Sequence, residues 1–261
     1  MSEKKLKYSV LQYSPSLISG ESINLGVLAT SEVEPLADFI STKKMKRIKE
    51  FDDEIDEEMV KLVLQGIKDE VEVTLENCNK IFDIQEFIQY YCNEYHFTRA
   101  IELSYQNFDK MVDELKRMYL PQDLAKDQRA SHKEELQFMA KILETNHVDF
   151  KRNVKEWGNY NDQIKYDFRI KNYGIKLFWL KGKDLRRLTN DVKAWAWNCQ
   201  YSPADIQTVI IYNNDADTNK KQEMKTFLEI FKASSDKIYS WTDGMKWLET
   251  LAKSDSDDKN S

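Results

Sequence analysis

The second half of the chain alternates short apolar runs with helical patterns, and this alternation limits the folds that it can adopt. Gln163–Lys171 is typical of a strand, and Asn172–Gly174 of a tight turn into a partner strand over Ile175–Lys181. A basic helix with tryptophans is predicted over about Lys183–Cys199, and Asp205–Asn213 is typical of a buried strand. An α/β layer arrangement buries such an order of elements well.

Further helices are predicted on both sides of this run. Ser131 and Glu134 have the spacing of a capping box, in which each residue bonds the other's backbone at a helix start, and this helix is expected to reach about Asn146. Two more helices are predicted over Lys220–Ala233 and from Thr242 to Lys253. The polar, acidic segment 254–261 is predicted to be a disordered tail.

The first half mixes the two kinds of pattern without a regular alternation, which favours an α+β domain over residues 1–121. The polar stretch Gln122–Arg129 is the predicted linker, and residues 131–253 form the predicted α/β domain. The predicted strands are Lys7–Tyr13, Ser22–Thr30 and Phe97–Leu103; the predicted helices are Ile55–Cys78, Ile84–Asn93 and Phe108–Tyr119; Pro35–Lys49 fits either type.

The two halves differ in charge, although the whole chain of 261 residues has a net charge of −6. Residues 1–150 have a net charge of −10, whereas residues 151–253 have a net charge of +6. Such an asymmetry predicts two modules with different partners. The basic half is suited to binding nucleic acid or to docking on the acidic first half of the chain, and composition alone does not choose between them.

Several classes of protein are disfavoured. No apolar run approaches the length of about 20 residues that a membrane helix requires, so no membrane partner is predicted. The N-terminus lacks a signal-peptide pattern, and three widely spaced cysteines suggest neither a disulfide framework nor a metal site, which predicts a cytoplasmic protein. Without a glycine-rich phosphate loop, no nucleotide cofactor is expected.

The predicted hairpin resembles a degenerate core of the restriction-endonuclease-like, or PD-(D/E)XK, group. That resemblance implies an Asp on one strand and Glu-x-Lys on the next, holding Mg²⁺ and activating water. Asp167 and Lys181 are the candidate catalytic residues, with Asp167 the candidate metal ligand, but Trp179 stands where the Glu is expected. Upstream and downstream carboxylates that could substitute are Glu156, Asp162 and Asp184. Magnesium is predicted only if the site is active; the alternative is a structural Asp–Lys pair.

A basic run with interleaved tryptophans is the second functional signal. Cations bind phosphates and aromatic rings stack on bases in nucleic-acid interfaces. The alternative is a solvated helix with tryptophans in the core, although Trp195 and Trp197 are two residues apart and cannot share a helix face. The candidate nucleic-acid-binding residues are Lys176, Lys183, Arg186, Arg187 and Lys193.

The N-terminal run Tyr8–Pro15, followed by Gly20-Glu21-Ser22-Ile23-Asn24-Leu25-Gly26-Val27-Leu28, resembles a bacterial family of unassigned function, numbered 3037. The resemblance extends over about residues 5–120, and Gln12 departs from the basic residue of many relatives. It implies a cytosolic bacterial protein, often from mobile or defence-associated neighbourhoods, and the family has no assigned activity. The motif residues are Tyr13, Pro15, Gly20, Glu21, Asn24 and Gly26, and a structural role for them is as plausible as a functional one.

Three functions follow from these signals. The first is a non-catalytic, defence-associated protein that binds nucleic acid or a protein partner through its basic half. The second is an active, magnesium-dependent nuclease with an unorthodox acid. The third is a protein-interaction subunit of a larger complex. Salt-sensitive binding to nucleic acid separates the first from the third.

Overall fold

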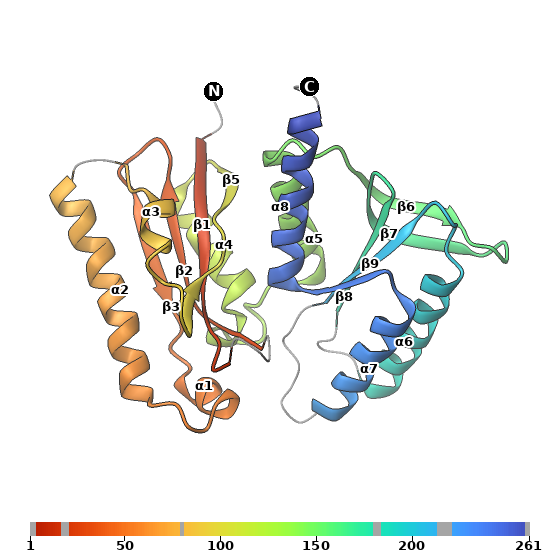
Figure 1. Ribbon diagram of the computed structural model, residues 1–261, viewed down its shortest axis with the longest axis horizontal. Helices are drawn as coiled ribbons and strands as arrows, with labels where there is room; N and C mark the ends of the chain where they lie inside the picture. Colours follow the sequence, from red (N-terminus) through yellow and green to blue (C-terminus); the bar gives the residue numbers. More distant parts are fainter. Residues whose placement is uncertain (1–3, 17–20, 79–80, 180–183, 213–220, 259–261) are drawn as a thin grey trace. The chain divides into compact units, whose positions relative to one another are not determined.

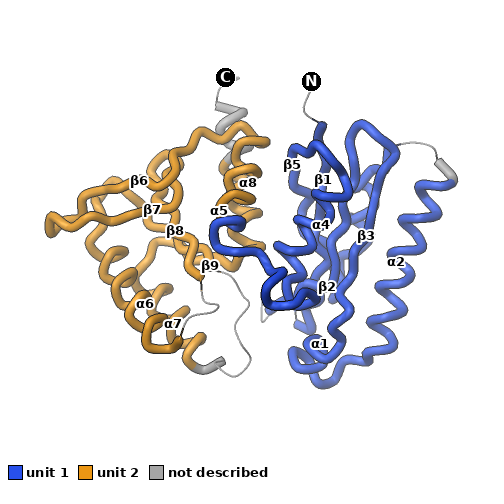
Figure 2. The backbone as a smooth tube through the Cα atoms, turned by 180° about the vertical axis from the view of Figure 1, so that it is seen from behind, with its two compact units in different colours: residues 1–135 blue, residues 136–261 orange. Residues whose placement is uncertain are grey.

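The computed structural model describes residues 4–16, 21–78, 81–179, 184–212 and 221–258. They divide into two compact units, unit 1 over residues 1–135 and unit 2 over residues 136–261 (Figure 2). The division falls inside the helix that follows the predicted linker. Both units mix helices and strands, with an antiparallel sheet in unit 1 and a mixed sheet in unit 2.

Unit 1 is a five-stranded antiparallel sheet with helices on both faces (Figure 1). The strand order is β3-β2-β1-β4, and β5 also pairs with β1. Its elements are β1 (Lys4–Tyr13), β2 (Ile23–Ser31), β3 (Ala37–Ser41), α1 (Met45–Phe51), α2 (Glu57–Cys78), α3 (Ile84–Ile88), β4 (Tyr95–Phe97), β5 (Ile101–Tyr105), α4 (Phe108–Tyr119) and a short 3-10 helix, η1 (Pro121–Asp123).

The core of unit 1 forms because α2 repeats apolar residues at helical spacing. Val60, Leu64, Ile67 and Val71 are buried against the sheet together with side chains of α1 and α3. On the other face, the N-cap of α4 is Asn107, whose side chain accepts the Lys110 N–H at 2.9 Å. The predicted bounds of α4 are confirmed.

The strand predicted over Phe97–Leu103 is divided in the structure into β4 and β5. Thr98 lies at the break, where its hydroxyl accepts the Val10 N–H at 3.0 Å and its own N–H donates to the Val10 carbonyl at 2.8 Å. A side chain therefore replaces one bond of the ladder to β1. Hydroxyl side chains compete with backbone partners in this way, and the sequence pattern does not reveal it.

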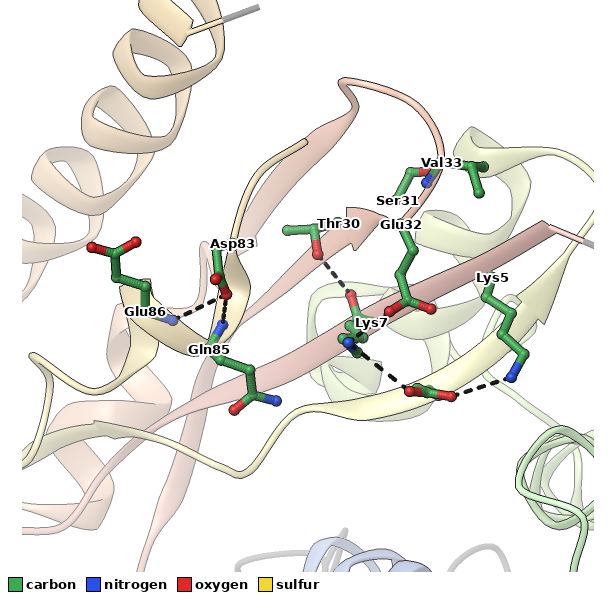
Figure 3. A network of polar contacts seen from close by, with 10 residues as sticks. Lys5, Lys7, Thr30, Ser31, Glu32, Val33, Asp83, Gln85 and Glu86 are labelled. Carbon is green, nitrogen blue, oxygen red and sulfur yellow. Dashed lines mark hydrogen bonds and ion pairs between the residues drawn. The ribbon is translucent and has the colours of Figure 1, made fainter. Parts of the chain in front are cut away.

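Charged side chains cover the solvent side of β1 (Figure 3). Lys7 lies 2.6 Å from Glu32 and 3.9 Å from Glu102, and Lys5 lies 3.4 Å from Glu102. The hydrogen bond with Glu32 is the largest cause that raises the pKa of Lys7. These side chains are about one third exposed, so the ion pairs contribute little to the stability of the fold.

A capping box joins the end of unit 1 to α5 (His132–Thr145), as predicted. The Glu134 carboxylate accepts the Ser131 N–H at 2.8 Å, and the Ser131 hydroxyl accepts the Glu134 N–H at 3.3 Å. Arg117 of α4 also donates to Glu134 at 2.6 Å. The Ser131 bonds come first among the causes that lower the pKa of Glu134 to about 2.

Replacing Glu134 with glutamine is expected to lower stability by about 1 kcal/mol at neutral pH, a modest value because the side chain is 38% exposed. The depressed pKa means that this contribution is present above the unfolded value of 4.5 and is lost as the pH falls toward about 2. Thermal unfolding of both proteins across this range measures the difference. A difference that stays constant down to the lowest pH would contradict the assignment.

Unit 2 is a five-stranded mixed sheet of order β10-β9-β8-β7-β6. The three strands β6, β7 and β8 pair antiparallel, whereas β8, β9 and β10 pair parallel. After α5, its elements are β6 (Lys151–Trp157), β7 (Gln163–Ile170), β8 (Tyr173–Phe178), α6 (Leu185–Gln200), β9 (Gln207–Tyr212), α7 (Lys221–Ser234), β10 (Lys237–Ser240) and α8 (Trp241–Asp258).

Helices cover both faces of this sheet, which gives a layered α/β arrangement (Figure 1). Phe178 and Ile210 pack with side chains of α6 and α7. On the opposite face, Gly244 lets α8 approach Ile211, because a methyl group there would lie 2.8 Å from its side chain. Among the described helices, none combines the length and apolar character that a bilayer crossing requires.

The structure corrects three sequence predictions in unit 2. The edge strand β6 was not predicted, because five of its seven residues are exposed and the run contains almost no apolar side chains. The predicted turn over residues 172–174 is wrong, since Tyr173 and Gly174 belong to β8 and the turn contains Lys171 and Asn172. Helix α8 includes residues 254–258, the first part of the predicted tail.

Candidate functional site

Asp167, the candidate catalytic and metal-binding residue, lies in the interior of unit 2 and is only 7% exposed. Both of its carboxylate oxygens lie 3.0 Å from the ammonium of Lys176, and one also accepts the Leu177 N–H at 2.9 Å. The Lys176 ammonium also lies 5.3 Å from the ring centre of Trp195. The carboxylate is thus engaged by a cation and a backbone donor from β8.

This position follows from a local break between β7 and β8. Their ladder runs from Ile170, opposite Tyr173, to Phe168, opposite Ile175, and ends there. Beyond it, the Asp167 side chain takes the Leu177 N–H that a β7 carbonyl would otherwise accept. Across the sheet, Asn153 of β6 has a φ of 52°, so the neighbouring strand is also irregular at this level.

The rest of the predicted catalytic arrangement is not assembled in the described residues. Lys181 lies outside them, and Trp179 is half-buried just after the end of β8. Asp167 instead contacts Lys176 and Leu177 of β8, which come before Trp179 in the sequence. Within the part of the chain that the structure describes, no group of three or more His, Cys, Asp or Glu side chains could hold a metal ion.

Two of the three carboxylates considered as substitutes have structural roles. Glu156 lies 3.6 Å from Arg169 in an ion pair between β6 and β7. Asp184 accepts the Arg187 N–H at 2.9 Å and is the N-cap of α6. Asp162 lies in the turn between β6 and β7, where its backbone carbonyl accepts the Gly158 N–H at 2.8 Å. Its carboxylate oxygen Oδ1 is buried and has no hydrogen-bond partner among the described residues. Local structure therefore explains the carboxylates of Glu156 and Asp184, but not that of Asp162.

The candidate nucleic-acid-binding residues are divided by the structure. Lys176 is held by Asp167, and Lys183 lies outside the described residues. Arg186, Arg187 and Lys193 are exposed on α6, and no ion pair involves them within the described part of the chain. The buried face of α6 is formed by Leu188, Val192 and Cys199; burial raises the pKa of the Cys199 thiol to about 12, so this cysteine is an unreactive core residue.

The two α6 tryptophans point to different sides, as predicted. Trp195 is half-buried and packs against Tyr166 with ring centres 5.9 Å apart. Trp197 is 49% exposed and contacts Tyr160, in the β6–β7 turn, and Tyr201, at the end of α6, with ring centres 5.8 and 4.2 Å away. Tyr160 is 64% exposed. The result is an exposed aromatic cluster that the sequence pattern did not reveal, because it joins residues from two elements.

Tyr13 and Asn24 of the N-terminal motif connect neighbouring elements of unit 1. Asn24 accepts a hydrogen bond from Gln12 at 2.9 Å and donates to the Tyr119 carbonyl at 3.2 Å, which ties β1 and β2 to the end of α4. Tyr13 is buried and donates to Asp52 at 2.6 Å, and burial is the largest cause that raises the pKa of its hydroxyl.

The remaining motif positions differ in their surroundings. Gly26 lies against the Phe39 ring, Pro15 and Glu21 are exposed, and Gly20 lies outside the described residues. Within the described part of the motif, the bonds of Gln12, Tyr13 and Asn24 hold neighbouring elements together. A packing role therefore accounts for them.

Comparison with known proteins assigns part of unit 1. No curated protein and no solved structure matches the chain. Residues 8–92 match a family model described as "Protein of unknown function (DUF3037)". The match ends before β4 and α4, so it is shorter than the resemblance over residues 5–120. Residues 8–92 are therefore similar to the DUF3037 family, and the C-terminal half is not identified by any of these comparisons.

Proposed function

We propose that unit 2 binds nucleic acid through the exposed side of α6 and does not cleave it. The observation that carries this proposal is a row of four exposed residues, the α6 stripe: Arg186, Asn190, Lys193 and Trp197. They are spaced by four, three and four residues, so they lie along one side of the helix. Two cations, an amide and an indole on one side of the helix offer contacts to phosphates, base edges and base faces.

Charge also supports this proposal. Residues 151–253 have a basic excess, and the α6 stripe contains no acidic residue. Its two cations have no ion-pair partner among the described residues, unlike Lys176, which Asp167 neutralises. A phosphate backbone would supply that missing negative charge and release bound counterions.

The element order supports nucleic acid as the partner. The run α5, β6, β7, β8, α6, β9, with an antiparallel meander followed by a parallel strand, is similar to the restriction-endonuclease-like core. Likeness of fold alone does not give function. The similar order of elements is consistent with a scaffold that has kept a nucleic-acid-binding surface without catalysis. A role associated with mobile genetic elements would suit such a protein.

The absence of cleavage is proposed because of the environment of Asp167. A magnesium site needs carboxylate and water oxygens around an open position. Here a lysine ammonium faces the carboxylate, and Trp179, which cannot ligate a metal, stands where the resemblance expects Glu. Lys176 thus supplies the positive charge that a metal ion would otherwise bring.

Fluorescence anisotropy with labelled RNA and DNA, in the full chain, tests the proposal. Reversing two charges of the stripe, in the variant Arg186→Glu, Lys193→Glu, is expected to weaken binding by about 100-fold at moderate salt, because each cation contributes roughly one phosphate contact. The matched control is Lys225→Glu, Lys232→Glu, which makes an equal charge change at the same spacing on exposed positions of α7. The control should bind within about threefold of wild type.

The same titrations with magnesium separate the remaining functions. Cleavage products that appear only with magnesium and vanish in Asp167→Ala would establish the nuclease instead. Equal weakening in both double variants would show only a general charge effect and would contradict a site on α6. Binding to no nucleic acid at low salt would reject the proposal and favour a protein partner.

A further inference from the structure

The ribbon formed by β6 and β7 places two lysines directly opposite each other. Lys155 pairs with Lys165 in the ladder, and both side chains are exposed. Directly opposite side chains lie about 5 Å apart at Cβ, and like charges at such positions destabilise a sheet. Within the described residues neither ammonium has an acidic partner, whereas Arg169, opposite Lys151 on the same ribbon, is neutralised by Glu156 at 3.6 Å. The pair therefore lacks a counter-ion.

Exposed aromatic rings follow immediately along the ribbon. Trp157 comes two residues after Lys155, so it lies on the same face, and it is 62% exposed opposite Gln163. Tyr160 follows in the turn. Figure 1 shows this end of the sheet of unit 2 extending beyond the other strands, alongside α6. Among the described residues of unit 2, the large apolar side chains with the greatest exposure are Tyr160, Trp157 and Trp197.

Packing on the other face of the ribbon fixes which side these residues occupy. Ile164 and Tyr166 are buried together with Ile206 and partly buried Trp195. Because strand residues alternate between faces, Lys165 and its partner Lys155 point to the opposite, exposed face. This exposed face, composed of Lys155, Trp157, Gln163 and Lys165, is called the ribbon face below.

The turn that carries Tyr160 is held in place rather than free. The Gly158 N–H donates to the Asp162 carbonyl at 2.8 Å, and the Asn159 N–H donates to the Tyr201 carbonyl at 3.0 Å. The Tyr160 ring also packs against Tyr201 at 4.9 Å and Trp197 at 5.8 Å. Rings that are already ordered lose little conformational entropy when a ligand stacks on them.

We propose that the ribbon face binds a single-stranded stretch of nucleic acid. Lys155 and Lys165 contact one phosphate from both sides, and Trp157 stacks on an unpaired base; Tyr160, in the turn beyond the ribbon face, can stack on a further base. This inference rests on the proposed function and assigns the class of nucleic acid. Stacking requires an open base face, which a duplex presents only at its ends, so the aromatic rings select single strands. The phosphate supplies the missing counter-ion of the lysine pair.

The variant Lys155→Glu tests this inference because stability and binding should move in opposite directions. It replaces a like-charge pair by an opposite-charge pair, so Tm is expected to rise by about 2 °C. Binding of labelled single-stranded oligouridylate of about 15 nucleotides is expected to weaken by about tenfold. The control Lys225→Glu, which makes the same charge change on α7, should change neither quantity appreciably. A fall in Tm would overturn the premise that the lysine pair is unneutralised.

The variant Trp157→Ala tests the stacking contribution. Single-strand binding is expected to weaken by about tenfold, whereas binding to a blunt duplex of equal length should change by less than about twofold. Equal losses for both probes would overturn the selection for single strands. If the double variant of the α6 stripe loses binding while Lys155→Glu and Trp157→Ala keep it, the ribbon face is rejected and the proposed function stands. If wild type binds neither probe, both are rejected.

Discussion

Replacing Asp167 with alanine is expected to lower the free energy of unfolding of unit 2 by about 3 kcal/mol. This value is at the lower end for breaking a buried ion pair, because the Lys176 side chain is still 19% exposed. Two groups lose their partner at once. The Lys176 ammonium is left beside Trp195 without a counter-ion, and the Leu177 N–H loses its acceptor. An unpaired buried charge and an unpaired buried donor are both costly.

Tryptophan fluorescence during urea unfolding of the full chain measures this effect. All six tryptophans lie after residue 150, so the signal reports on unit 2 and not on unit 1. The control is Asp167→Asn, which keeps an oxygen for the Leu177 N–H and removes only the charge. Its decrease in the free energy of unfolding should be roughly half that of the alanine variant. An alanine variant as stable as wild type would show that the pair is not structural.

The same substitution separates a structural carboxylate from a metal ligand by the sign of its effect. Ligands that await a metal repel one another, so their removal often stabilises the empty site, and added metal raises Tm by binding the folded state. A carboxylate already paired with Lys176 should give the opposite result. We expect Tm of wild type to be the same with and without millimolar magnesium. A magnesium-dependent rise that disappears in Asp167→Ala would restore the metal site.

Much of the fold can be predicted from local patterns in the sequence. Helix α4 and the Ser131–Glu134 capping box were predicted because their signals lie within a few neighbouring residues. Strand β6 was missed because an exposed edge strand needs no apolar alternation, and KRNVKEW has almost none. The break at Thr98 depends on a hydroxyl that bonds to β1, nearly ninety residues earlier, and no local pattern contains that information.

The candidate site was less predictable for the same reason. Asp167 is singled out by the resemblance of the hairpin to a nuclease core, but the partner of its side chain depends on register. Placing the turn at Lys171 and Asn172 sets Asp167 opposite Lys176, which the sequence assigned to phosphate binding. The lysine pair of the ribbon face depends on β6, which the sequence pattern does not indicate, and on its register with β7. The pair is therefore visible only in the structure.

Replacing Gly26 with alanine is expected to lower the free energy of unfolding of unit 1 by about 2 kcal/mol. A methyl group on β2 at this position would lie 2.6 Å from two carbons of the Phe39 ring and 3.0 Å from the Ile40 carbonyl oxygen. The ring is buried in the core, so it cannot swing into solvent, and the carbonyl belongs to the backbone of β3. Both neighbours must shift, which explains the glycine of the N-terminal motif as a packing requirement.

Gly66 on α2 provides the control with the opposite sign. A methyl group there has no neighbour within 4 Å, and the position lies inside a helix, so Gly66→Ala should stabilise unit 1 by about 0.5–1 kcal/mol. Hydrogen exchange followed by mass spectrometry measures both variants in the full chain. Exchange in β2 and β3 should accelerate in Gly26→Ala, and exchange in α2 should slow in Gly66→Ala. Unchanged protection of β2 and β3 in Gly26→Ala would mean that the sheet accommodates the methyl group, and the motif glycine would then need a functional explanation.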